Sequence, residues 1–429
     1  MTRPTAFLEG ARRRYGPRFT VRLLAQGRIV VIADPQEIKE VLSACPSVLH
    51  PGEGAKVIEP VVGSTSVIVL DEDRHLEQRK LMLPPFHGEA LQRLTGMIEE
   101  FAEREVASWP VGEPIALHPR LQRVALEIIL RVVFGVDEGR ELDAITEALT
   151  VMLDLGQSPA QALMMMPAFA WTPAARRQAR RMQEADRILF ELVEERRRRG
   201  EDRDDVLSML LAARHDDGTP LSDQELRDEL VTALVAGHET TASQLAWAFS
   251  ILSRMPELTG ALGDELSRGA GEELLKSTIQ EVMRVRPVIP NAEPRVVKQR
   301  CEIGPREYPA GTVLYPSSYL LHHDPAVYPD PYAFVAERFV ETPPKTYQWL
   351  PFGAGRRRCI GASFAMVEMQ AVLRAFLTRY TMRPSLPEPE LAVRRGITIT
   401  PAGQATVVLS NRSTQRVPAR LALADAALT

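Results

Sequence analysis

The sequence predicts a mainly α-helical protein with small β-sheets, an α+β chain of 429 residues that folds as a single domain. Leu, Ala, Glu and Arg dominate the composition while aromatic residues make up only 6%, which favours helices over sheets. From about residue 88 to 255 the apolar residues recur mostly three and four positions apart, the spacing of amphipathic helices. After Pro287, short β-branched segments alternate with proline-rich turns, and no internal repeat or low-complexity linker divides the chain in two.

The first elements follow from local signals along the chain. Residues 20–34 alternate and then become β-branched across a turn that contains glycine, which predicts a short hairpin. The segment 35–45 begins with Pro35, a residue suited to the first turn of a helix, and we expect a helix there. The stretch 185–205 predicts an amphipathic helix that ends in a charged loop, and we interpret its charges as solvated surface.

The C-terminal third has a different texture. Short strands are expected within residues 295–318, separated by turns rich in proline. The last helix is predicted within 361–380, and a strand-like segment follows at 396–409. The sequence therefore places a small mixed N-terminal part before a helical body, and a turn-rich region after it.

Charge and cysteine content exclude several classes of function. The formal net charge is −4, so no global basic field recruits nucleic acid or anionic lipid. The N-terminal residues contain no apolar run long enough for a signal peptide or membrane anchor, so we expect a cytoplasmic protein. The three cysteines, Cys45, Cys301 and Cys359, are too far apart for a disulfide framework and too few for a four-thiolate metal site.

A long helix with a polar centre is predicted between Ser222 and Pro256. Ser222 is followed three residues later by Glu225, which predicts a capping box at its start. The middle of the helix should be its most buried part, yet it contains Gly-His-Glu-Thr-Thr at 237–241. The threonines alone are compatible with hydroxyls that bond back to the preceding helical turn. The whole cluster instead suggests a helix that opens locally to hold a small polar ligand and pass protons to it.

The segment 351–361, Pro-Phe-Gly-Ala-Gly-Arg-Arg-Arg-Cys-Ile-Gly, places Cys359 among glycines and arginines. The cysteine lies just before a predicted helix, whose N-terminal amides favour a thiolate. Gly353 and Gly355 allow further backbone amides to approach, and Gly361 leaves room for a flat ligand. This arrangement suits an axial metal ligand better than a nucleophile, although an isolated buried cysteine is more often a small apolar core residue.

Four motifs resemble those of the cytochrome P450 family. Residues 352–361 fill every fixed position of its haem-binding signature, Phe-Gly-x-Gly-x-Arg-x-Cys-x-Gly, and 236–241 is similar to its oxygen-binding helix segment. Residues 281–284 match the family's Glu-x-x-Arg, and 336–339 differ from Pro-Glu-Arg-Phe only at Ala336. The resemblance extends from about residue 6 to 410, and it implies a cytochrome P450 domain over 1–412 followed by a flexible tail, 413–429.

The resemblance implies a haem b cofactor under the long central helix, with Cys359 as the ligand of the iron. It assigns the remaining cofactor contacts to Phe352, Gly353, Gly361, His75, Arg79, Arg295, Arg357, Ala236 and Gly237. The four cationic side chains among them are expected to hold the haem propionates, and the guanidinium of Arg357 suits a carboxylate. Glu281, Arg284 and Arg338 resemble a buried ion network that braces the cysteine loop.

The expected chemistry is that of a monooxygenase, with Thr240, Glu239 and Thr241 as the catalytic residues. Thr240 would hydrogen-bond the oxygen molecule, while Glu239 and Thr241 would relay protons. The two electrons would come from a ferredoxin and its reductase, since the chain leaves no room for a fused reductase. Arg356 and Arg358 are interpreted either as a docking patch for that acidic partner or as solvated surface.

The substrate is expected to be a small or medium hydrophobic molecule, such as a terpenoid, steroid or fatty acid, and the protein a monomer. Its pocket walls should come from residues 50–70, 159–171, 288–292 and 396–400, with Met164 to Met166 as flexible apolar contacts or core filler. Two alternatives remain at this point. One is a haem-thiolate peroxygenase or isomerase that needs no external electrons, and the other is a non-catalytic haem-based binder.

Overall fold

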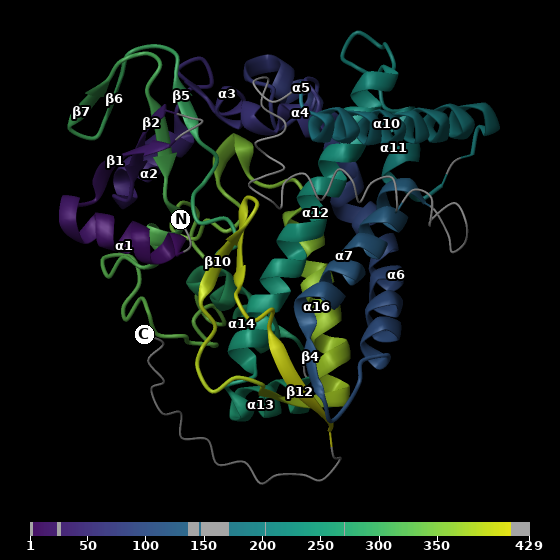
Figure 1. The fold of residues 1–429 in the computed structure, drawn as a ribbon, viewed down its shortest axis with the longest axis vertical. Coiled ribbons are helices and arrows are strands. Elements are labelled where there is room, and N and C mark those ends of the chain that lie inside the picture. Colours follow the sequence, from purple (N-terminus) through teal and green to yellow (C-terminus); the bar gives the residue numbers. More distant parts are fainter. Residues whose placement is uncertain are drawn as a thin grey trace.

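The computed structural model describes residues 3–23, 27–135, 146, 171–201, 203–269 and 271–412. Helices dominate this part of the chain, as the sequence predicts, and four small sheets lie at the edges of the helical body (Figure 1). The longer helices are α1 (Pro4–Tyr15), α2 (Pro35–Ser43), α5 (Glu72–Met82), α6 (Gly88–Ala107), α7 (Leu117–Phe134), α10 (Pro173–Arg199), α12 (Asp223–Leu252), α13 (Pro256–Ser267), α14 (Glu273–Val285) and α16 (Ala362–Arg379). The shorter ones are α3 (Pro51–Ala55), α4 (Glu59–Val62), α11 (Val206–Ala212) and α15 (Ser318–His322).

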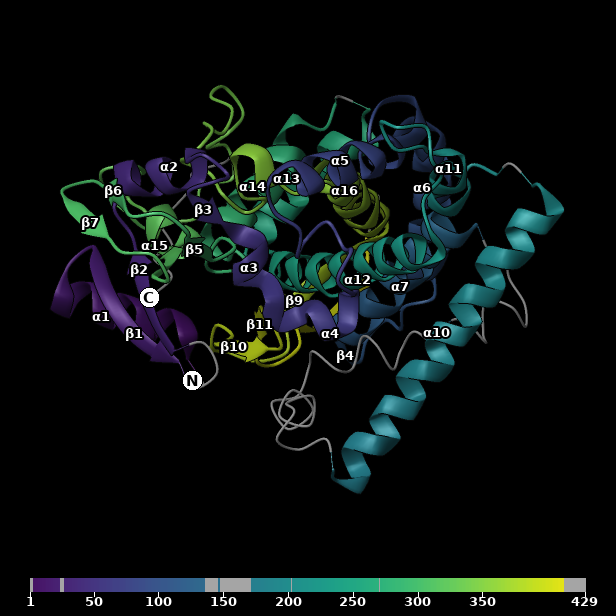
Figure 2. The same cartoon turned by 90° about the horizontal axis from the view of Figure 1, so that it is seen from above.

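Helix α12 crosses the centre of the molecule, with α7 and α16 beside it and α10 across its N-terminal end (Figures 1 and 2). The side chain of Ser222 accepts a hydrogen bond from the amide of Glu225, and the carboxylate of Glu225 accepts one from the Ser222 amide, so the capping box is confirmed. Thirty residues give a helix of about 45 Å. Most of its second half is buried in the main hydrophobic core.

The expectation that α12 opens locally is wrong. The helix is α-helical without interruption from Asp223 to Leu252. Gly237 serves helix packing instead, because a Cβ at this position would lie 2.9 Å from Cδ1 of Ile129 on α7. Real Cβ atoms do not approach other atoms so closely, so the glycine allows the two helices to come together.

The largest sheet joins the N-terminal part of the chain to a segment near residue 300. Its strand order is β1 (Arg18–Leu23), β2 (Gly27–Ile32), β8 (Val313–Pro316), β5 (Arg295–Val297) and β3 (Leu49–His50). Strands β1 and β2 form the antiparallel hairpin predicted from the sequence. Strand β2 also pairs in parallel with β8, with Ile29 opposite Val313. Residues near position 30 therefore share a sheet with residues near 300.

Three smaller sheets complete the described fold. Strands β4 (Pro114–Ala116), β12 (Thr406–Asn411) and β9 (Tyr380–Pro384) form one, β10 (Ala392–Arg395) and β11 (Thr398–Pro401) a second, and β6 (Cys301–Ile303) and β7 (Arg306–Tyr308) a third. The strand-like end predicted at 396–409 is thus divided between two sheets. The N-terminal helix α1 was not predicted, since its sequence is mostly polar and has only Leu8 buried.

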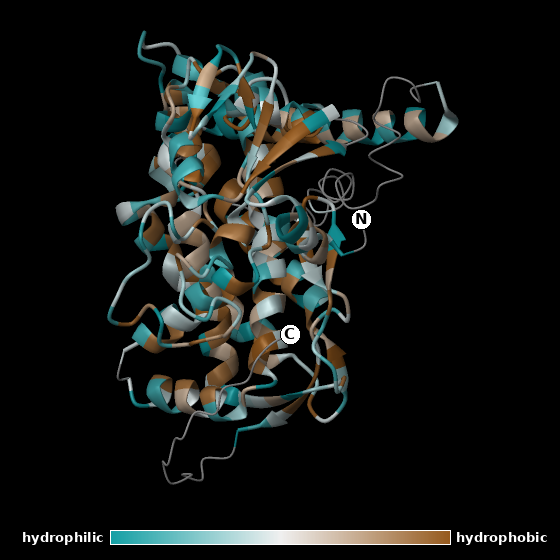
Figure 3. Ribbon diagram, turned by 90° about the vertical axis from the view of Figure 1, so that its left-hand side faces the viewer, coloured by the Kyte–Doolittle hydropathy of each residue, from teal (hydrophilic) through white to brown (hydrophobic). Residues whose placement is uncertain are grey.

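The helices of the body carry apolar and polar residues side by side, as Figure 3 shows by colour. Their apolar faces meet in one large core that includes residues of α6, α7, α12, α14 and α16. Among the described residues, no helix combines the length and apolar character needed to span a bilayer. The predicted tail 413–429 and most of the predicted wall segment 159–171, with Met164 to Met166, lie outside the described residues.

Candidate functional site

The loop around Cys359 has the backbone geometry that its glycines allow. Gly353 and Gly355 have φ angles of 64° and 68°, in the left-handed region that other residues rarely adopt. A Cβ at Gly355 would also lie 2.7 Å from the carbonyl oxygen of Leu42. The turn Gly355–Arg357 then leads to Cys359, whose amide donates to the carbonyl of Phe352 at 2.9 Å. These φ angles are a reason for glycine at 353 and 355, whereas the predicted approach of backbone amides to the sulfur stays a prediction.

Cys359 is both accessible and deep within the protein. It is an exposed residue, yet burial raises the pKa of its thiol, while the Gly361 amide and the charge of Arg79 act in the opposite direction. The two observations agree if the sulfur faces a space inside the molecule rather than bulk solvent. Gly361 is consistent with such a space, because a Cβ there would meet no atom within 4 Å. Phe352 is partly buried beside this loop and packs against Trp349, with ring centroids 5.8 Å apart.

A buried ion network supports this loop from behind. Glu281 and Arg284 on α14 are fully buried and joined by two hydrogen bonds of 2.7 and 2.8 Å. Arg338 adds a third to the same carboxylate at 3.0 Å. The guanidinium of Arg284 also donates to three backbone carbonyls, those of His322, Pro331 and Ala333. The network predicted by resemblance is confirmed, and it fixes the turn-rich segment before the cysteine.

His322 belongs to the same support and was not predicted from the sequence. Its Nε2 accepts from the amide of Leu350 at 2.8 Å, and its Nδ1 lies 3.1 Å from the carbonyl of Arg284. Burial holds the pKa of His322 well below its usual value, so the ring is neutral. The neutral tautomer matches these contacts, with Nδ1 donating and Nε2 accepting. His322 thereby ties α14 to the start of the cysteine loop.

Four basic side chains predicted as propionate contacts come from three separate parts of the chain. His75 and Arg79 lie on α5, Arg295 on β5 and Arg357 in the cysteine loop. Burial, together with the charges of Arg357, Arg79 and Arg295, lowers the pKa of His75 to about 3, so its ring is neutral. A cavity of about 200 Å³ is lined by His75, Arg295 and Arg357 and also by Asp71 and Glu72, so an anionic group placed here would compete with Asp71 for Arg357.

The arginines of this cluster have protein partners that the sequence did not indicate. Arg357 donates to Asp71 at 2.9 Å and to the carbonyl of Val67 at 3.0 Å. Arg295 donates to the carboxylate of Glu293 at 3.2 Å. Arg79 donates to the carbonyl of Arg358 at 2.6 Å, next to the cysteine. No local motif marks Asp71, because it meets Arg357 only through the tertiary fold, whereas Glu293 lies just two residues before its partner Arg295.

The centre of α12 presents Ala236 and Thr240 on its open side. Ala236 is exposed and Thr240 partly so, although the neighbouring residues His238 and Thr241 are buried. The hydroxyl of Thr240 donates to the carbonyl of Ala236 at 2.6 Å. This is the back-bonded arrangement that the sequence allowed as the simpler reading for a helical threonine. Burial also lowers the pKa of His238, so its ring is neutral.

Glu239 points away from Thr240 and into a polar cluster. Its carboxylate accepts hydrogen bonds from Gln122 Nε2 at 2.7 Å and from Ser243 Oγ at 3.0 Å. His118 Nε2 and Arg395 Nε lie 3.4 and 3.6 Å from Oε1. Burial acts to raise the pKa of Glu239, but the hydrogen bond and charge of His118, with Arg395 and Gln122, outweigh it and lower the pKa. Glu239 is therefore an ionised carboxylate in this arrangement.

The predicted wall segments that the structure describes lie against α12. Three residues of the 50–70 segment bond to it: Thr65 to Asp228, Ser66 to Thr232, and Val67 to Glu229. The segments 288–292 and 396–400 meet each other, because the Ile399 amide donates to the Val288 carbonyl at 2.8 Å. The Ile399 carbonyl accepts from the indole of Trp247 on α12. The fold thus brings these separate walls together.

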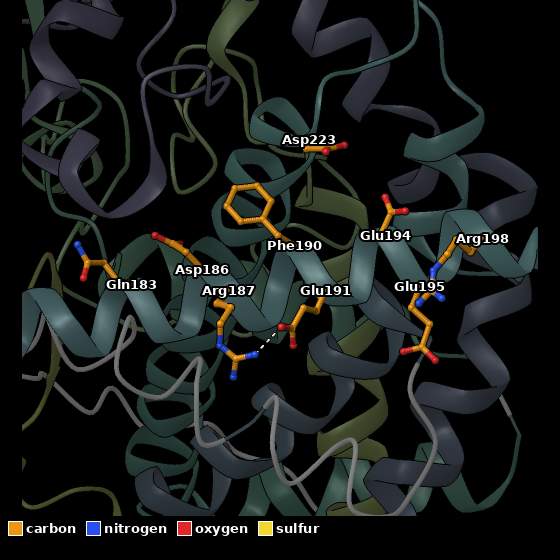
Figure 4. Close-up of a pocket in the computed structure, with 9 residues that line it drawn as sticks. All are labelled: Gln183, Asp186, Arg187, Phe190, Glu191, Glu194, Glu195, Arg198 and Asp223. Atoms are coloured by element: carbon orange, nitrogen blue, oxygen red, sulfur yellow. Dashed lines mark hydrogen bonds and ion pairs between the residues drawn. The ribbon is translucent and has the colours of Figure 1, made fainter.

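A second, larger groove of about 910 Å³ runs along α10 and reaches Asp223 at the start of α12 (Figure 4). Its lining is mostly charged, and Arg187 pairs with Glu191 within it. None of the predicted site residues lines this groove. We interpret these charges as the solvated face of an amphipathic helix, as expected from the sequence.

Comparison with known proteins agrees with this geometry. The family model named Cytochrome P450 matches residues 2–406. Cytochrome P450 135B1 of Mycobacterium tuberculosis is 36% identical over 423 residues, covering 95% of this chain and 89% of the relative. Cytochrome P450 138 of the same organism is 37% identical over 402 residues, covering 93% and 90%. These names give a family and a number but no substrate.

The fold comparison gives the same result. The structure of retinoic-acid-bound cyanobacterial CYP120A1 superimposes with a TM-score of 0.81 at 20% identity, covering 95% of this chain and 94% of that one. Haem, the cofactor of this family, fits the residues present: one thiol facing an open space, a glycine with room before it, and a cluster of cations for two carboxylates. The chain belongs to the cytochrome P450 family of haem-thiolate monooxygenases.

Proposed function

We propose that this protein uses molecular oxygen and two externally supplied electrons to hydroxylate or epoxidise a small to medium hydrophobic substrate, such as a terpenoid, steroid or fatty acid. The observation that carries the proposal is the accessible pair Ala236 and Thr240 in the middle of a helix that is otherwise largely buried. A haem protein that only binds its cofactor needs no such opening beside an ionised carboxylate.

Haem would be held by the residues of the cysteine loop and the cation cluster. Cys359 would supply the thiolate ligand, and Gly353 and Gly361 would shape the backbone around it. The propionates would be bound by His75, Arg79, Arg295 and Arg357. Their carboxylates would replace some of the present partners of the arginines, such as Glu293 and Asp71. Haem bound here supplies the metal centre at which dioxygen is activated.

The residues of α12 would handle the oxygen molecule and the protons. The Thr240 hydroxyl would exchange the Ala236 carbonyl for the oxygen molecule as its hydrogen-bond partner. Glu239 would carry protons toward Thr240, and the buried Thr241 would support that transfer from the protein side. Ala233, Ala236 and the apolar residues of the 50–70 segment would hold a hydrophobic molecule by shape.

The test of these roles is Thr240→Ala, assayed with ferredoxin, ferredoxin reductase and NADPH. Losing the hydroxyl should leave folding and haem content intact, since alanine favours the helix. It should misdirect protons, so that a larger share of the NADPH electrons appears as hydrogen peroxide and product falls by about 10²-fold or more. The probes are lauric acid, testosterone and limonene. Peroxide released per NADPH is measured whether or not a probe is oxidised.

Thr95→Ala is the matched control, because Thr95 also back-bonds within a helix but lies on α6. If Thr240→Ala keeps the wild-type partition of electrons, Thr240 is only a back-bonded helical residue.

A second arm of the experiment replaces the ferredoxin system with hydrogen peroxide. Reversing the charge of Arg356 and Arg358 should slow the ferredoxin arm and spare the peroxide arm if they dock the redox partner. Equal loss in both arms would contradict docking, and faster wild-type turnover with peroxide alone would favour a peroxygenase.

A further inference from the structure

A carboxylate just before β5 faces the basic side chains expected to hold the propionates. The Nη1 of Arg295 donates to Oε2 of Glu293 at 3.2 Å and to its backbone carbonyl at 2.6 Å. The Glu293 side chain is 24% exposed, yet burial raises the pKa of its carboxyl group. As for Cys359, the two observations agree if the carboxylate faces a space inside the molecule. Within the described part of the chain, no donor bonds its second oxygen, Oε1.

The second carboxylate beside these basic side chains is held more firmly. Asp71 accepts hydrogen bonds from the amides of Gly52 and Glu53 at 2.8 and 2.9 Å. It also accepts one from Arg357 at 2.9 Å, so both of its oxygens have donors. Glu293, which is bonded only by its near neighbour Arg295 among the described residues, is therefore the carboxylate that can change partners more easily.

The number of charges predicts that a bound haem brings one negative charge too many. Arg79, Arg295 and Arg357 supply three positive charges, while Asp71 and Glu293 supply two negative ones. The His75 ring is neutral, since its pKa is lowered to about 3. The two propionates of a haem would change this total from +1 to −1. An unpaired charge in a buried site is costly, so the loaded site should take up one proton.

Burial decides which group takes up this proton. A carboxylate loses its charge when it is protonated, whereas an imidazole gains one. Burial therefore favours protonation of Glu293 and opposes protonation of His75. The propionates would accept hydrogen bonds from the arginines, and such charge-assisted bonds favour their ionised form.

The other groups that face Glu293 do not compete for the proton. The charged ones are Arg295 on β5, Arg357 in the cysteine loop and Asp71 before α5. The arginines stay protonated, and Asp71 is already held by its three donors. Tyr315 on β8 also faces Glu293, and burial raises the pKa of its phenol, so it stays neutral.

We propose that Glu293 is a further haem-binding residue: its carboxyl group carries a proton on Oε1, donates it to a propionate in a hydrogen bond, and exchanges it with solvent as the charge of the haem changes. The proposal rests on the placement of haem given under the proposed function. It does not depend on the reaction proposed there.

The exchange is coupled to the transfer of one electron. An external donor that reduces ferric to ferrous haem adds one negative charge to the site, which raises the pKa of Glu293. Where Glu293 is a carboxylate in the oxidised protein, it then takes up one proton from solvent and forms an O–H bond at Oε1. Oxidation returns the electron to an acceptor and the proton to solvent. Each cycle therefore moves one electron and one proton.

The cavity of about 200 Å³ gives protons a route to this residue. Its lining includes the exposed residues Ser43 and Arg356 as well as the buried residues His75 and Arg295. The cavity thus extends from the surface to the side chain that bonds Glu293. Water can occupy a polar cavity of this size, so a proton can reach Glu293 without opening the fold.

The experiment is an anaerobic spectroelectrochemical titration of the substrate-free holoenzyme between pH 5 and pH 9, with dithionite as the reductant. In wild type the midpoint potential should fall as the pH rises, because ionised Glu293 disfavours reduction. For charges about 10 Å apart at an effective dielectric constant of about 20, the equilibrium constant of reduction changes about tenfold. This change equals about 59 mV for one electron. Glu293→Gln is neutral at every pH and should stay near the wild-type potential measured at pH 5.

Glu72→Gln is the matched control, because Glu72 lines the same cavity but bonds His50. It should keep the wild-type dependence on pH. A second measurement needs no variant and covers the case in which Glu293→Gln fails to hold haem. In redox-difference infrared spectra of wild type at pH 9, a protonated carboxyl band should appear on reduction. Labelling with carbon-13 glutamate should shift this band.

A wild-type potential that does not change with pH would overturn the proposal. So would a Glu293→Gln variant that keeps the wild-type dependence, or infrared spectra without a carboxyl band that moves with the label. Arg79→Gln separates these results from a wrong placement of haem. Its loss of a positive charge should lower the potential at every pH, and an unchanged potential would contradict the placement itself. Failure of the proposed reaction would instead appear as an unchanged electron partition in Thr240→Ala, and these potentials would stand.

Discussion

The cysteine loop and the centre of α12 are held in opposite ways. In the loop, backbone geometry and buried charges fix each position: Gly355 adopts a left-handed φ, and Arg284 bonds to Glu281 and to three carbonyls. At the centre of α12 the backbone is an ordinary helix, and side chains make contacts that can be exchanged. Thr240 bonds its own helix, and Glu239 bonds donors on other elements.

This difference matches the tasks that we propose for the two regions. A metal ligand must stay in one place through every step, so its support is built from groups that cannot move without exposing buried charge. Groups that pass protons must change partners, so they are held by hydrogen bonds that can be exchanged without a change in the backbone. The three predictions that follow test whether the first region is rigid and the second adjustable, in order of expected effect.

The largest effect is expected for Glu281→Gln. This change leaves the buried guanidinium of Arg284 without its counter-charge, and breaking a buried pair in this way typically costs about 3–5 kcal/mol. The measurement is urea unfolding of the haem-loaded protein, with haem loss followed by the absorbance of the Soret band. Glu272→Gln is the control, because its partner Arg374 is about one-third exposed and such pairs are worth about 1 kcal/mol or less. Equal costs for the two variants would contradict a rigid loop support.

An intermediate effect is expected for Gly237→Ala. Alanine favours a helix, but the new Cβ would be only 2.9 Å from Cδ1 of Ile129, and overpacking of this kind costs about 1–3 kcal/mol. The free energy of unfolding should fall, and Ile129→Val in the same chain should recover part of the loss by removing Cδ1. Gly96→Ala on α6 is the control, since a Cβ there meets nothing within 4 Å and should stabilise slightly. A stabilising Gly237→Ala would show that α7 can retreat from α12.

The smallest effect concerns His215, which lies between Glu77 on α5 and Glu225 at the start of α12, at 3.0 and 3.3 Å. Burial acts to lower the pKa of His215, but the two carboxylates outweigh it and raise it. A raised folded-state pKa means that the stabilisation is fully present below the unfolded value of about 6.5 and disappears as pH rises through the folded value. His215→Gln should therefore reduce the difference in melting temperature between pH 6 and pH 9, by an amount equivalent to about 1 kcal/mol or less.

The control for this last prediction is His87→Gln, because the His87 ring contacts the carbonyl of Leu83 rather than a carboxylate. It should keep the wild-type difference between the two pH values. If His215→Gln also keeps that difference, the histidine does not couple α5 to α12.

The sequence predicted features that depend on local backbone geometry better than features that depend on contacts between distant elements. The cysteine loop was predictable because its requirements are local: Gly353 and Gly355 need left-handed backbone, and the cysteine follows them within a few residues. The capping box of α12 was predictable for the same reason. Gly237 was misinterpreted as a site of helix opening, because only the tertiary fold shows Ile129 beside it.

The partners of Glu239 could not be predicted either, because they meet it only in the tertiary fold. His118 and Gln122 are four residues apart in the sequence, a spacing that any helix offers, and Arg395 lies at the other end of the chain. Likewise, no signal in the sequence marked Asp71, although it bonds Arg357, one of the three arginines expected to hold haem. The residues proposed as catalytic were named by resemblance, and only the fold shows which residues bond Glu239.

The parallel pairing of β2 with β8 has a consequence for how the protein is made. Ile29 leaves the ribosome early, but its partner Val313 follows only after about two-thirds of the chain, at rates of about 5–20 residues per second. Closing a loop of that length must precede any gain from the pairing, so the largest sheet is completed late. Arg295 lies on β5 of this sheet, and Cys359 is synthesised later still. The nascent chain therefore exposes an incomplete sheet edge through most of its synthesis, when it is most open to chaperones and to misassembly.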